Sequence, residues 1–447
     1  MRKLFGTDGI RAVAGEAPLD AKTIYAVGLA LAHQLNGSHS HPRVLLGMDT
    51  RESSEWIAAT IAAGLADGGA HVENAGVVTT PAIAFLARQR GFSAGVVISA
   101  SHNPWQDNGI KVFGNDGYKL PDETELRIET EIFRRLEKVE APQPGSAPAV
   151  NNKYRAEYER FLRSAVPGLN LKGLSVVLDC ANGAASAIAP ELFEHLGGNI
   201  HLTHASPDGR NINANCGALH PDVVAAETKS LGADLGVTFD GDADRAMLAD
   251  ANGKVVNGDA VMLLAARDMK QRDLLRNGTV VATTMSNMGL EAALRRDGIR
   301  MLRAPVGDKY VLERMQLEQA SLGGEQSGHI LFPHLATTGD GLLTALVVLD
   351  VIRRSGRPLH ELIADLKVFP QVIVNVRVRE KKPLDEIATV KDTILAAEAE
   401  LAESGRVVVR YSGTEALARV MIEAESEEAM NRHADRIAAA IRAELGA

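Results

Sequence analysis

A pattern that occurs three times along the chain constrains its fold more than any other feature of the sequence. Each copy has a short apolar run, a polar turn, a helical stretch, a glycine and a second apolar run. The first runs and the glycines of the three copies are residues 43–49 with Gly69, 175–179 with Gly197, and 279–284 with Gly298. Glycine ends a helix in the left-handed conformation, and the apolar run that follows predicts a buried strand. Three such units in tandem predict three mixed-sheet α/β domains of similar build.

The last part of the chain follows a different pattern. Residues 372–379 alternate apolar and polar with a period of two, which predicts a half-exposed strand, and residues 406–410 and 419–423 predict two more. Ser426 is a suitable N-cap for a closing helix. The apolar stripe expected on that helix is Met430, Ala434, Ile437, Ala438 and Ile441. These features predict a smaller C-terminal α+β domain.

The length of the chain and its breaks predict four domains. The chain has 447 residues, and single hydrophobic cores stop growing at about 250–300 residues. A Pro/Gly-rich linker occupies 141–148, and further breaks lie at Asn252-Gly253 and Phe369-Pro370. We therefore expect domains at 1–153, 154–254, 255–368 and 369–447.

Composition excludes several classes of function. The net charge of −9 and the 4% of aromatic residues disfavour a surface for nucleic acid or for anionic membranes. No apolar run approaches the roughly 20 residues that span a bilayer, and the first residues become polar too soon for a signal peptide. Two cysteines, Cys180 and Cys216, make no disulfide framework, although a single bridge stays open. We expect a cytoplasmic protein with a small-molecule ligand.

Ser101 lies where ligands of α/β proteins bind. The apolar run 95–98 predicts a strand, which the segment Ser-Ala-Ser-His-Asn-Pro ends, since Pro104 cannot pair in a sheet. Ligands of α/β sheets bind beyond the carboxyl ends of strands. Ser101 is therefore a candidate nucleophile, and an ordinary turn serine is the alternative. His102 is equally compatible with a catalytic and a structural role.

Three aspartates alternate after the predicted strand 235–239. If the chain stays extended, Asp240, Asp242 and Asp244 point to one side. Crowded carboxylates repel one another unless a cation lies among them, and oxygen ligands favour Mg²⁺ or Ca²⁺. An EF-hand is excluded because its sixth position is Arg245 instead of glycine. A magnesium site is the main interpretation, a solvated acidic turn is the alternative, and Arg245 fits as a partner of the carboxylates or of a phosphate.

Other polar segments offer groups for binding a sugar phosphate. The loop between the last two strands has the residue types of a phosphate nest, namely Arg410, Ser412, Gly413, Thr414 and Arg419. The glycine-rich segment 323–329 carries Glu325, Ser327 and His329, which can bind sugar hydroxyls. Lys309, Arg11 and Lys111 follow glycines, so we interpret 6–11 and 108–111 as turns that deliver a cation. For each segment, a solvated loop is the alternative.

Taken together, these motifs resemble the α-D-phosphohexomutase superfamily over the whole chain. The matching segments are 5–11, 99–104 with 108–111, 240–245, 324–329 and 410–419. The resemblance is greatest to bacterial members that act on glucosamine phosphates. It implies four domains around a central cleft and interconversion of glucosamine 6-phosphate and glucosamine 1-phosphate, which feeds amino-sugar nucleotide and cell-wall precursor synthesis.

The resemblance also implies roles for the residues. Ser101 corresponds to a serine that is phosphorylated in the active form and that, with the three aspartates, holds one Mg²⁺. Arg11, Lys111 and His329 correspond to groups for proton transfer and charge stabilisation at the reacting phosphate. Arg245 and His102 would lie near the metal. The segment with Glu325 and Ser327 implies sugar binding, and the 410–419 loop implies binding of the phosphate that is not reacting. A hexosamine 1,6-bisphosphate is the implied intermediate.

One position departs from the family pattern, and several alternatives stay open. Ala416 stands where the family usually has proline, which leaves the phosphate loop less rigid and removes no hydrogen-bond donor. The alternatives are a phosphomannomutase/phosphoglucomutase, a non-catalytic sugar-phosphate sensor and a phosphohydrolase. The sequence leaves open a homodimer and a kinase that first phosphorylates Ser101.

Overall fold

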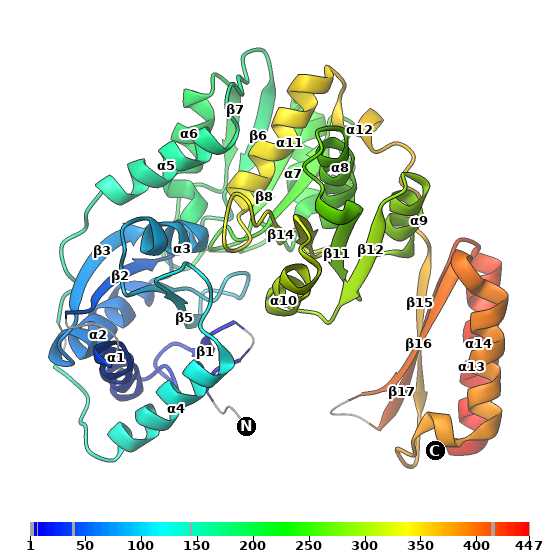
Figure 1. Ribbon diagram of the computed structural model, residues 1–447, viewed down its shortest axis with the longest axis horizontal. Helices are drawn as coiled ribbons and strands as arrows, with labels where there is room; N and C mark the ends of the chain where they lie inside the picture. The colour runs from blue at the N-terminus through cyan, green and yellow to red at the C-terminus, as the bar shows by residue number, and fades with distance from the viewer. Residues whose placement is uncertain (1–3, 7, 38–40, 144, 413–415, 447) are drawn as a thin grey trace. The chain divides into compact units, whose positions relative to one another are not determined.

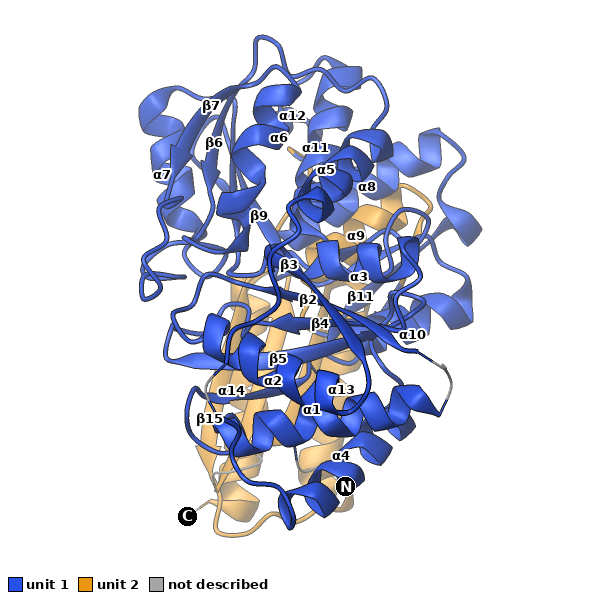
Figure 2. Ribbon diagram, turned by 90° about the vertical axis from the view of Figure 1, so that its left-hand side faces the viewer, with its two compact units in different colours: residues 1–284, 302–363 blue, residues 285–301, 364–447 orange. Residues whose placement is uncertain are grey.

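A computed structural model describes residues 4–6, 8–37, 41–143, 145–412 and 416–446. Within these residues the strands form four sheets. Contacts divide the chain into two compact units, residues 1–284 with 302–363 and residues 285–301 with 364–447 (Figure 2). Three mixed α/β sheets and one smaller antiparallel sheet confirm the predicted fold class.

The first sheet of the larger unit carries the predicted Ser101 turn. Its strand order is β1 (Ile10–Val13), β5 (Asp107–Gly114), β4 (Ala94–Ile98), β2 (Arg43–Met48) and β3 (His71–Val77). Strand β2 is parallel to β3 and β4, whereas β4–β5 and β5–β1 are antiparallel. Its helices are α1 (Ala21–Asn36), α2 (Ser54–Asp67), α3 (Thr80–Gln89) and α4 (Asp122–Leu136). The first predicted strand–helix–strand unit is confirmed as β2, α2 and β3.

Successive side chains of the strands point to opposite faces of this sheet, and helices pack against both faces. Val44, Leu46 and Val96 pack in one core cluster with α1, α2 and α4. On the opposite face, Cβ atoms at Gly47 and Gly95 would lie 2.6 and 2.7 Å from the Ile83 side chain of α3. Helix α3 can therefore pack closely against the sheet, which fixes the carboxyl end of β4 between two layers.

The second sheet has the same plan and carries the aspartates. Its order is β10 (Val255–Val256), β9 (Ala246–Asp250), β8 (Leu235–Phe239), β6 (Ser175–Asp179) and β7 (Asn199–Thr203). Strand β6 is parallel to β7 and β8, and β8–β9 is antiparallel. Its helical elements are α5 (Lys153–Ala165), a 3₁₀ turn (Ala184–Ala187), α6 (Ala189–His195) and α7 (Pro221–Leu231). The predicted helix of the second unit is thus a 3₁₀ turn followed by α6.

The third sheet carries the glycine-rich segment, and its order is β12 (Arg300–Ala304), β11 (Thr279–Thr283), β13 (Leu322–Gly324) and β14 (Ile330–Leu331). The helical elements of this part of the chain are α8 (Gly258–Gln271), a 3₁₀ turn (Arg276–Gly278), α9 (Met288–Arg296), α10 (Asp308–Glu318), α11 (Gly341–Ser355) and α12 (Leu359–Leu362). The third predicted unit is confirmed as β11, α9 and β12, although α9 belongs to the smaller compact unit.

The smaller unit has an antiparallel sheet of order β15 (Gln371–Arg377), β17 (Leu417–Ala424) and β16 (Gly405–Tyr411). Helices α13 (Ala388–Leu401) and α14 (Glu427–Leu445) pack on it, and 3₁₀ turns occupy Leu384–Glu386 and Ala402–Ser404 (Figure 1). The Ser426 side chain caps α14 by accepting a hydrogen bond from the backbone NH of Ala429. All five residues of the predicted apolar stripe are buried in this core.

Three further points concern the chain as a whole. Cys180 and Cys216 are both buried and free. In the part of the chain that the structure describes, every helix is too short or too polar to cross a membrane. The domain boundaries at 153, 254 and 368 stay predictions.

Candidate active site

Ser101 lies in the turn that joins β4 to β5, at the carboxyl end of β4. Its side chain is almost fully buried, and its backbone has a φ of 53°. This left-handed conformation costs a non-glycine residue about 1–3 kcal/mol of conformational energy, so surrounding contacts must maintain it. The predicted strand followed by a turn is therefore confirmed, and the turn is a strained one.

The three aspartates also lie in a turn, so the expected extended segment is wrong. Ala243 has a φ of 55°, and its backbone NH donates to the carbonyl of Asp240 at 3.0 Å. This turn, instead of strand alternation, brings one oxygen of each carboxylate within 4.8 Å of the others. All three side chains are buried. The carboxylates converge as predicted, by a different local geometry.

The serine turn and the aspartate turn meet, as the sequence analysis expects. The Ser101 hydroxyl donates a hydrogen bond to Asp240 Oδ2. At Gly241, an added Cβ would lie 2.5 Å from the Ser101 carbonyl oxygen, so a glycine allows the two turns to approach. Thr80, at the start of α3, donates from its hydroxyl to Asp242 Oδ2 at 2.5 Å. The two sheets thus share one buried polar centre.

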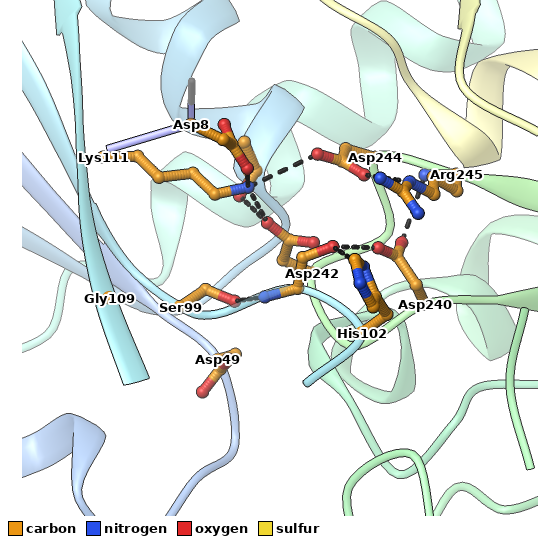
Figure 3. Close-up of polar contacts among 12 residues, drawn as sticks. Asp8, Asp49, Ser99, His102, Gly109, Lys111, Asp240, Asp242, Asp244 and Arg245 are labelled. Carbon is orange, nitrogen blue, oxygen red and sulfur yellow. Dashed lines mark hydrogen bonds and ion pairs between the residues drawn. The ribbon is translucent and has the colours of Figure 1, made fainter. Parts of the chain in front are cut away.

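Lys111 supplies the central cation of this cluster (Figure 3). Its Nζ lies 2.8 Å from Asp242 Oδ2, 2.9 Å from Asp8 Oδ2 and 3.4 Å from Asp244 Oδ2. The prediction of a turn at 108–111 is wrong, because these residues belong to β5. A Cβ at Gly109 would lie 2.5 Å from the Ser99 carbonyl oxygen, so this glycine serves close approach of the backbone instead of a turn.

Arg11, Arg245 and His102 surround the same centre. Arg11 lies on β1 and pairs with Asp8. Directly before this strand, Gly9 has a φ of 82° and its carbonyl accepts from the Gly6 NH at 2.9 Å, so a glycine turn precedes Arg11 as predicted. Arg245 donates its backbone NH to Asp240 Oδ1 at 3.1 Å, and its Nε lies 3.8 Å from an oxygen of Asp244. His102 Nδ1 lies 3.4 Å from Ser101 Oγ. The predicted placement of Arg245 and His102 near the aspartates therefore holds.

The glycine-rich segment brings His329 to the aspartates. His329 is buried, with Nδ1 at 3.6 Å from Asp244 Oδ1 and Nε2 at 3.6 Å from Asp308 Oδ2. Ser327 donates its hydroxyl to Glu325 Oε2 at 3.3 Å, and the backbone NH of Gly307 donates to Glu325 Oε1 at 3.0 Å. Lys309 follows in the first turn of α10, where its ammonium pairs with Asp122.

The pKa values of neighbouring groups in this site are shifted in opposite directions. Burial and repulsion by the other two aspartates raise the pKa of Asp240 well above its ordinary value. For Asp244, Lys111 and His329 overcome the effect of burial and hold the pKa well below it. Burial opposes the charge of His329, but Asp244 raises its pKa to about 9. Burial, with Arg245 and Arg11, lowers the pKa of His102 to about 4. Lys111 and His329 are therefore cations, and His102 is neutral.

The donor set fits a hard divalent cation. Among the described residues, Asp242 Oδ1 and Asp244 Oδ1 are buried oxygens that accept no hydrogen bond. Burial and the two neighbouring carboxylates raise the pKa of Asp240, and a cation bound among the three aspartates would oppose that rise. Three converging carboxylates, two of them with an oxygen that accepts no hydrogen bond, and no sulfur or imidazole among them, are the ligand chemistry of Mg²⁺ or Ca²⁺.

Several residues of the site escaped the sequence analysis. Lys119 Nζ lies 2.6 Å from Asp8 Oδ1 and 2.6 Å from Asp308 Oδ2, so it links the N-terminal segment to α10. Asp8 lies inside the glycine motif at 6–11, whereas nothing local distinguishes Lys119 from a surface lysine. Thr80 likewise stands at an ordinary helix start.

The smaller unit holds the predicted phosphate loop. Gly413 and Thr414 lie outside the described residues. Arg410 and Arg419 are cross-strand neighbours on β16 and β17. Ser412 is buried, and its carbonyl accepts a hydrogen bond from Lys381 Nζ at 2.6 Å. Lys381 is a third cation beside this loop, which the sequence analysis missed because it lies 31 positions away.

Comparisons with known proteins agree with this architecture. Models of the phosphoglucomutase/phosphomannomutase alpha/beta/alpha domains I, II and III match residues 2–139, 156–253 and 257–369, and the model of the C-terminal domain matches 373–440. A curated relative, the phosphoglucosamine mutase of Koribacter versatilis, is 61% identical over 100% of this chain and 98% of its own.

Solved structures share the fold. A phosphoglucomutase/phosphomannomutase family protein from Burkholderia thailandensis superposes with a TM-score of 0.78 at 23% identity, over 99% of this chain and 98% of its own. The N-acetylphosphoglucosamine mutase of Aspergillus fumigatus, in complex with GlcNAc-6P and magnesium, does so with a TM-score of 0.63 at 19% identity, over 99% and 96%. The four matching domain models and the full-length relative establish that this chain belongs to the phosphoglucomutase/phosphomannomutase family.

Proposed function

We propose that this protein is a mutase that interconverts glucosamine 6-phosphate and glucosamine 1-phosphate through a phosphorylated Ser101 and a hexosamine 1,6-bisphosphate. The observation that carries the proposal is the contact between Ser101 and Asp240, a nucleophile beside a buried carboxylate cluster. The full-length relative from Koribacter versatilis, a phosphoglucosamine mutase at 61% identity, favours glucosamine over mannose or glucose as the sugar.

The reaction conserves the phosphoryl group in two transfers. In the first, the P–O bond to Ser101 breaks and a new P–O bond forms to a sugar hydroxyl; the proton of that hydroxyl leaves to a base, and the released Ser101 Oγ takes up a proton. In the second, the other phosphate of the bisphosphate returns to Ser101 Oγ, whose proton leaves to a base, and the sugar oxygen that loses this phosphate takes up a proton. Before phosphorylation, the hydrogen bond to Asp240 holds the proton of Ser101 Oγ.

Lys111 and His329 act in these transfers chiefly through their charge. Both are buried cations beside Asp244. A fixed cation stabilises the negative charge that spreads over the phosphoryl oxygens, and its effect is greatest where water is excluded. Arg11, at the edge of the cluster, is suited to bind the reacting phosphate through its guanidinium.

Asp240, Asp242 and Asp244, with an oxygen of phosphorylated Ser101, would hold one Mg²⁺. When bound, such an ion neutralises charge on the phosphoryl group in transfer. Asp242 Oδ1 and Asp244 Oδ1, which accept no hydrogen bond, support this assignment, and the Aspergillus protein binds magnesium together with a sugar phosphate. Arg245 then orients the aspartates from outside.

The remaining site residues would bind the substrate. Glu325 and Ser327 present oxygens for the sugar hydroxyls. The phosphate that is not reacting would bind at the phosphate loop of Arg410, Ser412, Gly413, Thr414 and Arg419. Lys309, in the larger unit, would supply a cation for binding the substrate. Exclusion of water from the phosphoserine would protect it from hydrolysis. The homodimer and the activating kinase stay predictions.

One assay tests the proposal against its alternatives. The rates of isomerisation of glucosamine 6-phosphate, glucose 6-phosphate and mannose 6-phosphate are measured side by side, with Mg²⁺ and a trace of hexose 1,6-bisphosphate. We expect the glucosamine substrate to be fastest and turnover to require both additions. Release of inorganic phosphate without isomerisation would indicate a phosphohydrolase. Absence of phosphate on Ser101 in the purified protein, together with no turnover, would indicate a sugar-phosphate sensor.

A further inference from the structure

Two side chains bind the same two backbone carbonyls of the Ser101 turn. Arg51 Nη2 lies 3.0 Å from the carbonyl oxygen of Ser101 and 2.6 Å from that of Asn103. Asn213 Nδ2 lies 2.9 Å and 3.1 Å from the same two oxygens. We call Arg51 and Asn213 the carbonyl clamp.

The clamp has one arm on each of two sheets. Arg51 follows strand β2 of the first sheet, and its side chain is fully buried against Asp49, with which it pairs. Asp49 is held in turn by the Ser54 hydroxyl at 2.8 Å. Arg51 therefore cannot take another rotamer without leaving Asp49 as a buried, unpaired charge.

Asn213 comes from the loop that follows β7 of the second sheet. Its backbone NH donates to the Ala181 carbonyl at 2.9 Å, and the NH of Ala181 donates to Asp179 at 2.9 Å. Asp179 also accepts a hydrogen bond from the backbone NH of Gly217 at 2.9 Å, so it ties the later part of this loop to the end of β6. The second arm is thus anchored to the sheet that also carries the aspartate turn.

The clamp acts on the strained residue itself. Ser101 has a φ of 53°, which a residue with a side chain seldom adopts unless its surroundings impose it. Its backbone NH donates to Ser99 Oγ at 3.0 Å, and its carbonyl is held by Arg51 and Asn213. With both peptide groups fixed, only the side-chain torsion of Ser101 stays free, and Oγ then points to Asp240.

We propose that Arg51 and Asn213 are positioning residues for phosphoryl transfer, which hold the Ser101 backbone in the conformation that aims Oγ at the aspartate cluster. The inference rests on the proposed function for its catalytic part. Neither side chain touches the reacting atoms. Because Asn213 reaches across from the second sheet, it sets the distance between the nucleophile and the carboxylates, and substrate binding does not depend on it.

Asn213→Ala tests the proposal, and Asn215→Ala is its matched control. Asn215 is an exposed asparagine of the same loop with φ of 53°, against 57° for Asn213, and its side chain forms no hydrogen bond with the described residues. Both variants therefore carry the same cost of placing alanine in a left-handed conformation. Only Asn213→Ala also loses a side-chain hydrogen-bond donor to the Ser101 turn. We expect Asn213→Ala to lower kcat about 10- to 100-fold with KM within about twofold, because small misplacement of a reacting group has effects of this size. Asn215→Ala should leave both near wild type.

Hydrogen–deuterium exchange provides a second measurement that needs no turnover. The amides of residues 99–103 should exchange about tenfold faster in Asn213→Ala than in Asn215→Ala, because the turn opens more often without the clamp. If the wild-type protein isomerises no sugar phosphate, the proposed function fails and exchange alone decides whether the clamp holds the turn. Arg51→Lys keeps the positive charge but loses the branched guanidinium that contacts both Asp49 and the two carbonyls. It should raise the exchange rate of the same residues.

Three results would overturn the inference. One is unchanged exchange in Asn213→Ala and Arg51→Lys. Another is faster exchange with unchanged kcat, which would remove the link to catalysis. The third is an equal loss of kcat in Asn213→Ala and Asn215→Ala, which would assign the effect to the loop backbone.

Discussion

The hydroxyl of Ser101 donates a hydrogen bond to the carboxylate of Asp240, across 139 residues of sequence and between two sheets. Each partner lies in a turn with a left-handed residue, Ser101 itself in one and Ala243 in the other. Such residues are disfavoured and concentrate at functional sites, where their surroundings impose the conformation.

Replacing Ser101 by alanine should abolish mutase turnover and leave the fold intact. The variant loses the hydroxyl that accepts the phosphoryl group, so we expect a loss of at least about 10³-fold in kcat, in the range seen when a nucleophile is removed. Mass spectrometry should show the wild-type phosphate on the 99–104 peptide and none in the variant. Near-normal turnover in Ser101→Ala would remove this residue from the mechanism.

Asp242→Asn should weaken the dependence on Mg²⁺ and the rate together. An amide oxygen keeps the shape of the ligand and loses its charge, so the Mg²⁺ concentration for half-maximal rate should rise about tenfold, which corresponds to about 1.4 kcal/mol. Asp222→Asn, at an exposed position in the first turn of α7, is the control. An unchanged Mg²⁺ titration in Asp242→Asn would argue against the metal site.

Lys119→Met should destabilise the larger unit. Lys119 neutralises Asp8 and Asp308, and its loss leaves two carboxylates facing each other in a largely buried place. We expect a fall of about 2–5 °C in the midpoint of thermal unfolding, by calorimetry, from the loss of these two partly buried ion pairs. The exposed Lys172→Met should change the midpoint little. Adding Asp308→Asn should restore part of the loss, and a double variant that is less stable than Lys119→Met would contradict this explanation.

Stability should depend on pH through Asp340, which caps α11 and accepts a hydrogen bond from the Tyr158 hydroxyl at 2.6 Å. Burial raises the pKa of Asp340 from its ordinary 3.8 to about 6. The folded state therefore binds this proton more tightly than the unfolded state, so the contribution of Asp340 to stability falls as the pH rises from about 4 to 6.

Asp340→Asn isolates this effect, because an asparagine does not titrate: its one oxygen can accept from the backbone NH of Leu343, and its NH2 group can donate to the Tyr158 hydroxyl oxygen, so any cost of the exchange is independent of pH. The urea midpoint of the variant relative to wild type should rise with pH across this window. The difference in the free energy of unfolding should be at most about 3 kcal/mol, since one pKa unit corresponds to about 1.4 kcal/mol. Parallel pH profiles for the two proteins would show that Asp340 ionises freely in the folded state.

Local patterns sufficed for the elements and for the principal site residues. The strands β2, β6 and β11, and the glycines that end the helices after them, follow from apolar runs and from residues that favour left-handed turns. The Ser426 cap and the stripe of α14 follow from side-chain chemistry within one helix. Ser101 and the three aspartates stand out because their residue types directly follow buried strands.

Only the tertiary structure decided how these residues meet. Gly109 looks like a turn signal but lies on β5, where it allows close approach to the Ser99 carbonyl. Gly241 lies in the aspartate turn and allows that turn to approach Ser101. Arg51, Lys119 and Asn213 have no local signature, since an arginine, a lysine or an asparagine in a loop is usually solvated. Their roles come from distant partners. Arg51 and Asn213 bind Ser101, which lies 50 and 112 positions away from them, and Lys119 binds Asp308, 189 positions away. Burial turns such pairings into strong constraints, because an unpaired charge or amide is costly once water is excluded.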